Sequence, residues 1–266
     1  MKVGLPSRLL LLLGIVVSPS LQAQTSLHAW GDQLFHNGQR LVTSPSQWPQ
    51  TQWLEAGGLV VISGTLMATA DQGVADYHDR HRLGRINDVM QGVSDIMSPL
   101  ALAGYAGLVW GAGQLLPNDE LSNSGFKMGE AVVYATLITG GVKVVVGRSR
   151  PNSGADAGEF SPWSWRDAQQ SFPSAHAAAA FAAARALSPH LTPEQRITAY
   201  GAATLVSYSR IYQGDHWLSD VVFGAGLGYA VGAELADDNG ENATHRSSWL
   251  LTPLPAGIGV SWQQSW

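Results

Sequence analysis

The 266-residue sequence contains no cysteine. Disulfide bonds, thiolate metal sites, a cysteine nucleophile and a lipid anchor on an N-terminal cysteine are therefore excluded. Charged residues are also scarce, because Asp, Glu, Lys and Arg make up 13% of the chain, against about a quarter in ordinary proteins. The formal net charge of -5 provides no basic surface of the kind that binds nucleic acid, so we expect no nucleic-acid partner.

Long uninterrupted apolar runs are rare as well. A membrane-spanning helix needs about 20 apolar residues, and the only clean charge-free window of that length is 96–116, which Pro99 interrupts near its beginning. Mean hydropathy is close to zero. We therefore favour a domain that is soluble or peripheral to a membrane surface, with an inner-membrane multi-pass protein as the alternative.

The first 23 residues have the pattern of an export signal. Lys2 and Arg8 accompany an apolar core at 9–17, and Ala23 ends a region suited to cleavage. We predict a signal peptide at 1–23, with an uncleaved anchor as the alternative. The domain that follows is then exported, and periplasmic if the source is bacterial.

Apolar segments alternate with short polar ones through the middle of the chain, and strand patterns are almost missing there. We predict an all-α fold, a six-helix bundle over 53–236, preceded by a loose polar segment at 24–52. The tail at 237–266 contains the alternation Ile258, Val260, Trp262 and is predicted to be irregular or a β-hairpin. The expected helices cover about 54–70, 89–116, 128–147, 177–187, 194–209 and 217–235.

The stretch FPSAHAAAAFAAARAL, at 172–187, begins an alanine helix with a histidine. Ser174 is suited to cap this helix. The first N–H groups of a helix lack intrahelical partners and carry the positive end of the dipole, so they attract anions such as phosphate. His176 would stand beside such an anion. The alternative is a capped helix with an incidental histidine.

Two further stretches carry charged residues at helix ends. Lys143 and Arg150 are two helical turns apart and precede Pro151, which ends the helix. They either bind an anion or are ordinary basic residues at a helix C-terminus. Arg148, between them, either adds to this basic side or faces solvent.

The other stretch contains a histidine and an aspartate four residues apart. On a helix His216 and Asp220 are neighbours, and a carboxylate on one ring nitrogen leaves the other nitrogen free as a nucleophile or base. Arg210, just upstream, has a planar fork suited to phosphate. The alternative is a surface His–Asp pair.

Taken together, the order Lys-x6-Arg-Pro, Pro-Ser-x-His and Ser-Arg-x5-His-x3-Asp resembles the superfamily of type 2 phosphatidic acid phosphatases. That superfamily also holds the bacterial class A acid phosphatases and the vanadium haloperoxidases, and it implies a helical bundle. One departure is Ala175, where the family usually has glycine. Alanine keeps the backbone N–H donor, but it does not suit a site that needs positive φ.

The resemblance also implies roles for the residues. His216 is similar to the nucleophile that forms a phosphohistidine, Asp220 to the residue that orients it, and His176 to the general acid. No metal or other cofactor is implied, and vanadate is expected to inhibit. The phosphate-binding set implied is Lys143, Arg150, Ser174, the Ala175 N–H and Arg210.

The predicted function is an exported, metal-independent phosphatase. Its expected substrate is a phosphorylated lipid, of the phosphatidic acid, polyprenyl diphosphate or lipid A type. A small phosphoester is the second candidate. The alternatives are a broad-specificity soluble periplasmic acid phosphatase and a vanadate-dependent haloperoxidase. A binding protein with a relict site is disfavoured, because binding alone does not need both histidines. The polar stretch 76–82 (DYHDRHR) is predicted to be a loop between helices rather than a metal cluster.

Overall fold

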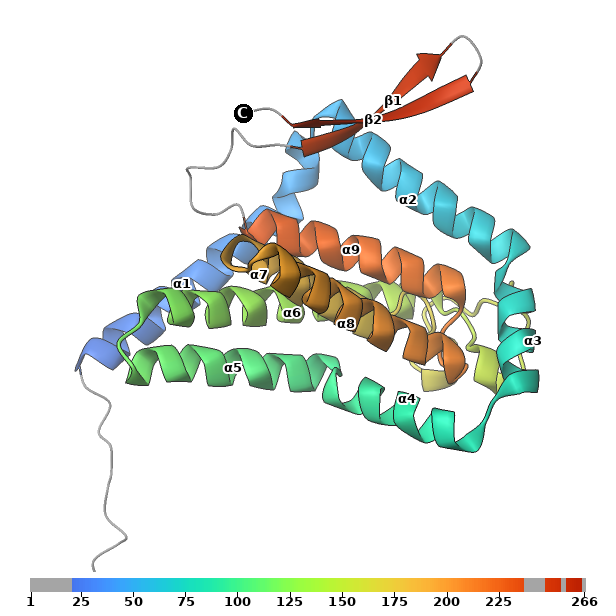
Figure 1. Ribbon diagram of the computed structural model, residues 1–266, viewed down its shortest axis with the longest axis horizontal. Helices are drawn as coiled ribbons and strands as arrows, with labels where there is room; N and C mark the ends of the chain where they lie inside the picture. The colour runs from blue at the N-terminus through green and yellow to red at the C-terminus, as the bar shows by residue number, and fades with distance from the viewer. Residues whose placement is uncertain (1–20, 237–246, 255–256, 265–266) are drawn as a thin grey trace, which may run out of the picture. The chain divides into compact units, whose positions relative to one another are not determined.

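The structure is a computed structural model that describes residues 21–236, 247–254 and 257–264, with side chains described over 30–236. Nine α-helices and one antiparallel pair of strands lie in these described residues (Figure 1). The predicted all-α fold is confirmed, and the tail contains the hairpin strands β1 (Ser247–Leu254) and β2 (Gly257–Gln264). The helices are α1 (Leu21–Thr43), α2 (Gln50–Thr69), α3 (Asp71–His81), α4 (Gly84–Ile96), α5 (Pro99–Leu115), α6 (Asp119–Val146), α7 (Ala175–Leu187), α8 (Pro193–Tyr212) and α9 (Leu218–Ala236).

The chain divides into two compact units, 1–43 and 44–266. Helix α1 lies in the first unit, so the expectation of a loose segment from residue 24 is wrong for 24–43. No proline interrupts this stretch, and the helix ends just before Ser44 and Pro45. Residues 1–20 of the predicted signal peptide lie outside the described residues, and that prediction is not tested.

All six expected helices are present, but the stretch expected as one helix at 89–116 belongs to two helices, α4 and α5. Pro99 has no N–H to continue α4, and the chain bends by 47° at the break before α5. The hydroxyl of Ser98 caps the new helix by accepting a hydrogen bond from the N–H of Ala101 at 3.2 Å. Proline at N1 therefore starts a helix here as well as ending one.

The predicted polar loop at 76–82 is wrong, because residues up to His81 belong to helix α3. The sequence there is hydrophilic, yet its helix has one side turned toward the protein. Val74 packs against Ile211 and Val221, and Asp71 is fully buried. Tertiary contacts therefore stabilise a helix that local hydrophobicity did not indicate.

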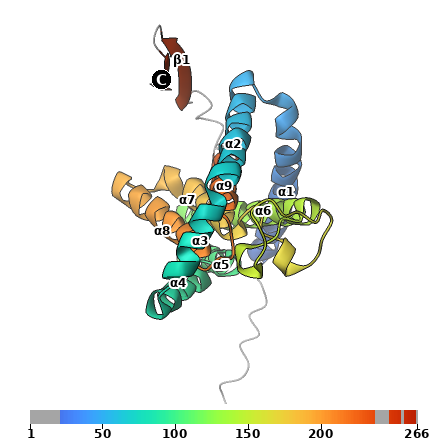
Figure 2. The ribbon, with the colours of Figure 1, turned by 90° about the vertical axis from the view of Figure 1, so that its right-hand side faces the viewer.

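Helix α7 lies at the centre of the bundle and packs against α5, α6, α8 and α9 (Figures 1 and 2). Its alanines other than Ala175 are buried. Small side chains allow neighbouring backbones to approach closely; at Gly224 of α9, for example, a Cβ would lie 2.5 Å from the carbonyl oxygen of Ser174. The N-terminus of α7 is thus held against the first turns of α9.

The chain leaves α6 through Gly147, which has φ 63° and caps the helix in the left-handed conformation. A Cβ at this position would lie 1.8 Å from the carbonyl oxygen of Ser161. Only glycine fits both the dihedral angle and the space. This turn starts the irregular segment 147–174, which crosses the end of the bundle and supplies much of the site described next.

Candidate active site

Three chain segments meet at one end of the bundle. They are the C-terminal end of α6 with the segment after it, the N-terminus of α7, and the turn between α8 and α9. A backbone bond from the Asn152 N–H to the Gly214 carbonyl oxygen, 2.8 Å long, ties the first segment to the turn. Another, from the Ser174 N–H to the Asp220 carbonyl oxygen at 3.0 Å, ties the start of α7 to α9.

The His216 side chain is buried at the centre of this meeting point, with 3% of its surface exposed. The residue lies just before α9, so the four-residue spacing to Asp220 joins a turn to the first turn of a helix. Its Nδ1 atom lies 3.7 Å from Oδ2 of Asp220 and has no hydrogen-bond partner in the described part of the chain. The pair is therefore close but not hydrogen-bonded.

Asp220 is itself held by several donors. Its Oδ1 accepts from Arg148 at 2.5 Å, and its Oδ2 accepts from the hydroxyl of Ser171 at 2.5 Å and from the Trp217 N–H at 2.9 Å. Burial raises the pKa of the Asp220 carboxyl, and the Arg148 guanidinium and these hydrogen bonds oppose that rise. The carboxylate is thereby fixed beside His216.

Arg148 has neither of the two expected placements. It is completely buried, so it does not face solvent, and its guanidinium turns toward carboxylates rather than toward the other cations. Besides Asp220, it donates to Oδ2 of Asp71 at 2.7 Å and to the Ala157 carbonyl oxygen. Sequence reasoning missed Asp71, which is 77 residues away from Arg148 along the chain.

Lys143, Arg150 and Arg210 surround the histidine with positive charge. The ammonium of Lys143 donates to the carbonyl oxygens of Ser171, at 3.2 Å, and of Gln170. Arg150 lies 2.7 Å from Asp167 and 3.6 Å from Asp215, and Arg210 lies 2.7 Å from the same Asp215. These carboxylates, which sequence reasoning also missed, hold both guanidiniums in place.

Helix α7 begins as the sequence predicted. The hydroxyl of Ser174 accepts from the Ala177 N–H at 3.4 Å and caps the helix. Ala175 is the first helical residue and does not belong to the positive-φ residues of the described chain. Its departure from the family's glycine therefore causes no backbone strain, and its N–H lies in the unpaired first turn.

His176 follows on α7, partly exposed. Burial, then the charges of Arg210, Lys143 and Arg150, lower the pKa of His176 to about 3. Burial and Lys143, Arg150, Arg210 and His176 likewise hold the pKa of His216 well below its usual range. Both imidazoles are therefore neutral at pH 7. Because the same three cations act on both rings, the structure brings together all eight residues singled out from the sequence.

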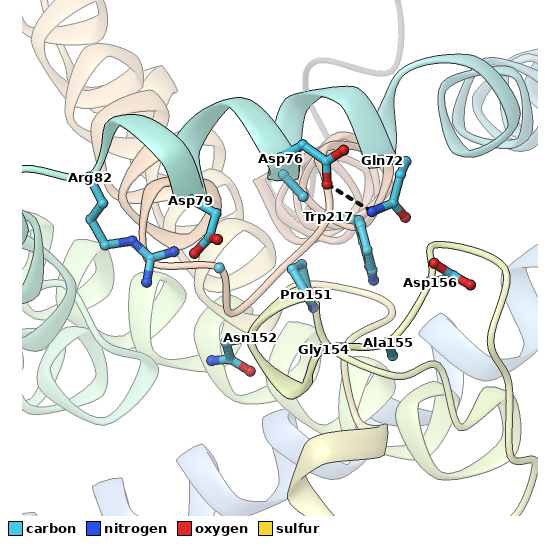
Figure 3. A pocket seen from close by; sticks show the side chains of 12 residues that line it. Gln72, Asp76, Asp79, Arg82, Pro151, Asn152, Gly154, Ala155, Asp156 and Trp217 are labelled. Atoms are coloured by element: carbon cyan, nitrogen blue, oxygen red, sulfur yellow. Dashed lines mark hydrogen bonds between the residues drawn. The ribbon is translucent and has the colours of Figure 1, made fainter.

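A polar cleft of about 320 Å³ lies beside this site, between α3 and the segment 151–156 (Figure 3). Pro151, which follows Arg150, and Trp217, which follows His216, both line it. The side-chain amide of Gln72 donates to Asp76 at 2.9 Å at its edge. No group of three or more metal-binding side chains occurs among the described residues.

Comparison with known proteins gives a family match for the part of the chain that carries the site. Residues 124–242, which include every motif residue of the site, match the model of the PAP2 superfamily. Lipid A 1-phosphatases of Rhizobium johnstonii and Rhizobium etli are each 38% identical to this chain over 101 residues. That match covers 36% of this chain and 40% and 42% of theirs, so the chain spans about two fifths of the length of these relatives.

A solved structure shares the fold. The crystal structure of a transmembrane PAP2 type phosphatidylglycerolphosphate phosphatase from Bacillus subtilis aligns with a TM-score of 0.57 at 22% identity. The alignment covers 73% of this chain and 98% of that one. The site motifs, the fold and the sequence matches agree, and they support the predicted resemblance of this chain to the PAP2 superfamily, that of the type 2 phosphatidic acid phosphatases.

Proposed function

We propose that the protein is a phosphatase that acts on a phosphorylated lipid through a phosphohistidine at His216. One observation carries this proposal: three cations and a helix N-terminus surround the buried, neutral imidazole of His216. Phosphoryl transfer needs mainly positioning and charge stabilisation, and this arrangement supplies both. Nδ1 of His216 faces Asp220, which leaves Nε2 to attack phosphorus.

The reaction has two steps. In the first, Nε2 of His216 forms a bond to phosphorus while the bond to the leaving oxygen breaks, and His176 donates the proton that this oxygen takes up. In the second, His176 removes a proton from water, the water oxygen attacks phosphorus, and the N–P bond breaks to release phosphate. Asp220 stabilises the positive charge on His216 in both steps, and Lys143, Arg150, Arg210, Ser174 and the Ala175 N–H hold the phosphoryl oxygens.

Protonation of His176 depends on the substrate. Burial, and then the charges of three nearby cations, lower the pKa of His176 and keep the ring neutral before binding. A phosphate ester with two negative charges offsets these cations, which favours the protonated ring. The substrate thus prepares the general acid that its own cleavage needs, and the proton that His176 takes up on binding comes from solvent.

Three observations support a lipid as the substrate. The two curated relatives are lipid A 1-phosphatases by name. A second hollow of about 450 Å³, between α2 and α9, is lined mainly by apolar side chains such as Leu59, Phe223 and Leu227. The segment that carries Arg150 also exposes Trp163 and Trp165 almost completely, at 71% and 82%, as is common at membrane–water interfaces.

The surface supports a membrane-embedded domain over the soluble or peripheral form favoured from the sequence. Helix α6 is long and apolar enough to cross a membrane, and up to three spans result if the bent pairs α2–α3 and α4–α5 each count as one. Large apolar side chains on these helices are exposed, including Val61, Leu100, Leu108 and Leu137. In a membrane, lipid hydrocarbon would shield these apolar side chains from water, whereas in solution they would stay exposed to it. On the basis of the predicted export signal, we propose that the site lies on the extracytoplasmic side.

Phosphate release by the purified chain in detergent tests the proposal. Phosphatidic acid, a polyprenyl diphosphate, a lipid A phosphate and p-nitrophenyl phosphate are compared, each with EDTA present and with His216→Ala as the control. Release from at least one lipid, lost in the variant and retained in EDTA, is the expected result. Release from the aryl phosphate alone points to a broad acid phosphatase instead, and bromide oxidation after addition of vanadate and peroxide points to a haloperoxidase.

A further inference from the structure

Asp71 is the first residue of α3, at a bend of 56° between α2 and α3. Its carboxylate is completely buried, although it lies outside the three motifs and outside the family match at 124–242. Oδ1 accepts from the Ser219 N–H at 2.9 Å, and Oδ2 accepts from the Ser219 hydroxyl at 2.5 Å and from Arg148 at 2.7 Å. Every contact of this carboxylate thus goes to the surroundings of Asp220.

Arg148 joins the two carboxylates. One terminal nitrogen, Nη2, donates to Asp71, and the other, Nη1, donates to Asp220 at 2.5 Å and to the Ser219 hydroxyl at 2.8 Å. A guanidinium is planar and rigid, so fixing one nitrogen also fixes the direction of the other. The position of Asp220 relative to His216 therefore depends on Asp71.

Asp71 also fixes the turn that carries both reacting residues. Ser219 lies between His216 and Asp220, and its backbone N–H is one of the unpaired donors in the first turn of α9. By accepting from this N–H, Asp71 caps α9 from a distant helix. The same carboxylate therefore orients the Asp220 side chain through Arg148 and its backbone through Ser219.

We propose that Asp71 is a positioning residue for phosphoryl transfer, one that holds Asp220 through Arg148 and Ser219 so that Asp220 can orient His216. The proposal rests on the function proposed above. Asp71 touches none of Lys143, Arg150 and Arg210 in the described contacts. Its loss should slow the reaction and leave phosphate binding almost unchanged.

The test replaces Asp71 with asparagine, which keeps the shape and removes the charge. Asp88→Asn, on the exposed surface of α4, is the matched control. In Asp71→Asn we expect kcat to fall roughly 10- to 100-fold, by analogy with the loss of the outer partners that orient metal ligands. The KM for p-nitrophenyl phosphate and the inhibition constant of vanadate should stay within about twofold of wild type, because their ligands are intact.

A kcat within twofold of wild type in a folded Asp71→Asn protein would overturn the proposal. So would a parallel loss of vanadate affinity and kcat, which would indicate general disruption of the site. If Asp71→Asn does not fold, as judged by its melting temperature, Ser219→Ala decides, because it keeps all three charges and removes the two hydrogen bonds of the Ser219 hydroxyl, to Asp71 and from Arg148. A several-fold fall in kcat at constant KM is expected there, and unchanged kcat overturns the proposal. An inactive wild-type chain would instead contradict the proposed function.

Discussion

Oδ2 of Asp220 lies 3.7 Å from Nδ1 of His216, too far for a hydrogen bond, although both side chains are buried and no other partner of Nδ1 lies in the described residues. The Asp220 carboxylate instead accepts hydrogen bonds from Arg148, Ser171 and the Trp217 N–H. In the proposed reaction, His216 would gain positive charge as it attacks phosphorus, and that charge would draw the Asp220 carboxylate closer.

This relationship predicts the effect of Asp220→Asn. The variant keeps the shape but removes the charge that stabilises His216 during attack, so kcat for p-nitrophenyl phosphate should fall roughly 10⁴-fold, as when the aspartate of a catalytic triad is replaced by asparagine. KM should change little, because the three cations remain. The melting temperature, measured in parallel, shows whether the variant is folded. A folded variant with near-normal kcat would remove Asp220 from the mechanism.

His176→Ala should discriminate between leaving groups. An alkyl phosphate needs a proton on its leaving oxygen, so its hydrolysis should fall about 10²- to 10⁴-fold, the usual contribution of general acid catalysis. p-Nitrophenolate leaves without full protonation, so its release should fall much less. The ratio of the two rates in the variant and in wild type is the measurement. Equal losses on both substrates would count against the general-acid role.

Anion binding should take up protons. Burial and three cations lower the pKa of His176 to about 3 in the ligand-free site, and a bound anion offsets these cations and raises that pKa. Calorimetry of vanadate or phosphate binding near pH 6, in buffers of different ionisation enthalpy, measures the protons exchanged. We expect net uptake in wild type and less uptake in His176→Ala. Equal uptake by the two proteins would argue that other groups bind the proton.

The same pKa shift predicts how stability depends on pH. The unfolded chain protonates His176 near its ordinary pKa of about 6.5, whereas the folded chain protonates it only near pH 3. Between these values the unfolded state binds more protons, so the free energy of unfolding falls as the pH decreases. The contribution of neutral His176 is fully present above about pH 6.5 and is lost as the pH falls toward 3. Ligand-free His176→Ala should therefore melt with a weaker pH dependence than wild type between pH 7 and pH 4.

The sequence predicted the parts of the site that depend on local structure. Ser174 caps α7 and places His176 in its first turn, because helix N-termini follow from a few adjacent residues. Lys143 lies in the last turn of α6, just before Gly147 turns the chain. Arg150 lies after that turn and directly before Pro151. These features need no knowledge of distant segments, and the structure brings all of them to one place.

Features that depend on distant contacts were not predicted. Arg148 was expected either to add to the basic side or to face solvent, and only the fold shows that it is buried between Asp71 and Asp220. Helix α3 was expected as a loop, because its polar sequence gives no sign that Asp71 and Val74 face the protein. Asp167 and Asp215, which bind the arginines, occur in polar stretches that look alike in the sequence.

The measurement that tests the central claim most directly is the detection of a phosphoenzyme on His216. Wild-type protein would be mixed with a lipid phosphate substrate, quenched at alkaline pH to preserve phosphohistidine, digested and examined by mass spectrometry, with His216→Ala as the control. The mechanism predicts a phosphate on the wild-type peptide that contains His216 and none on the variant peptide. Phosphate release at normal rate by His216→Ala, or a phosphate attached to a different residue, would contradict it.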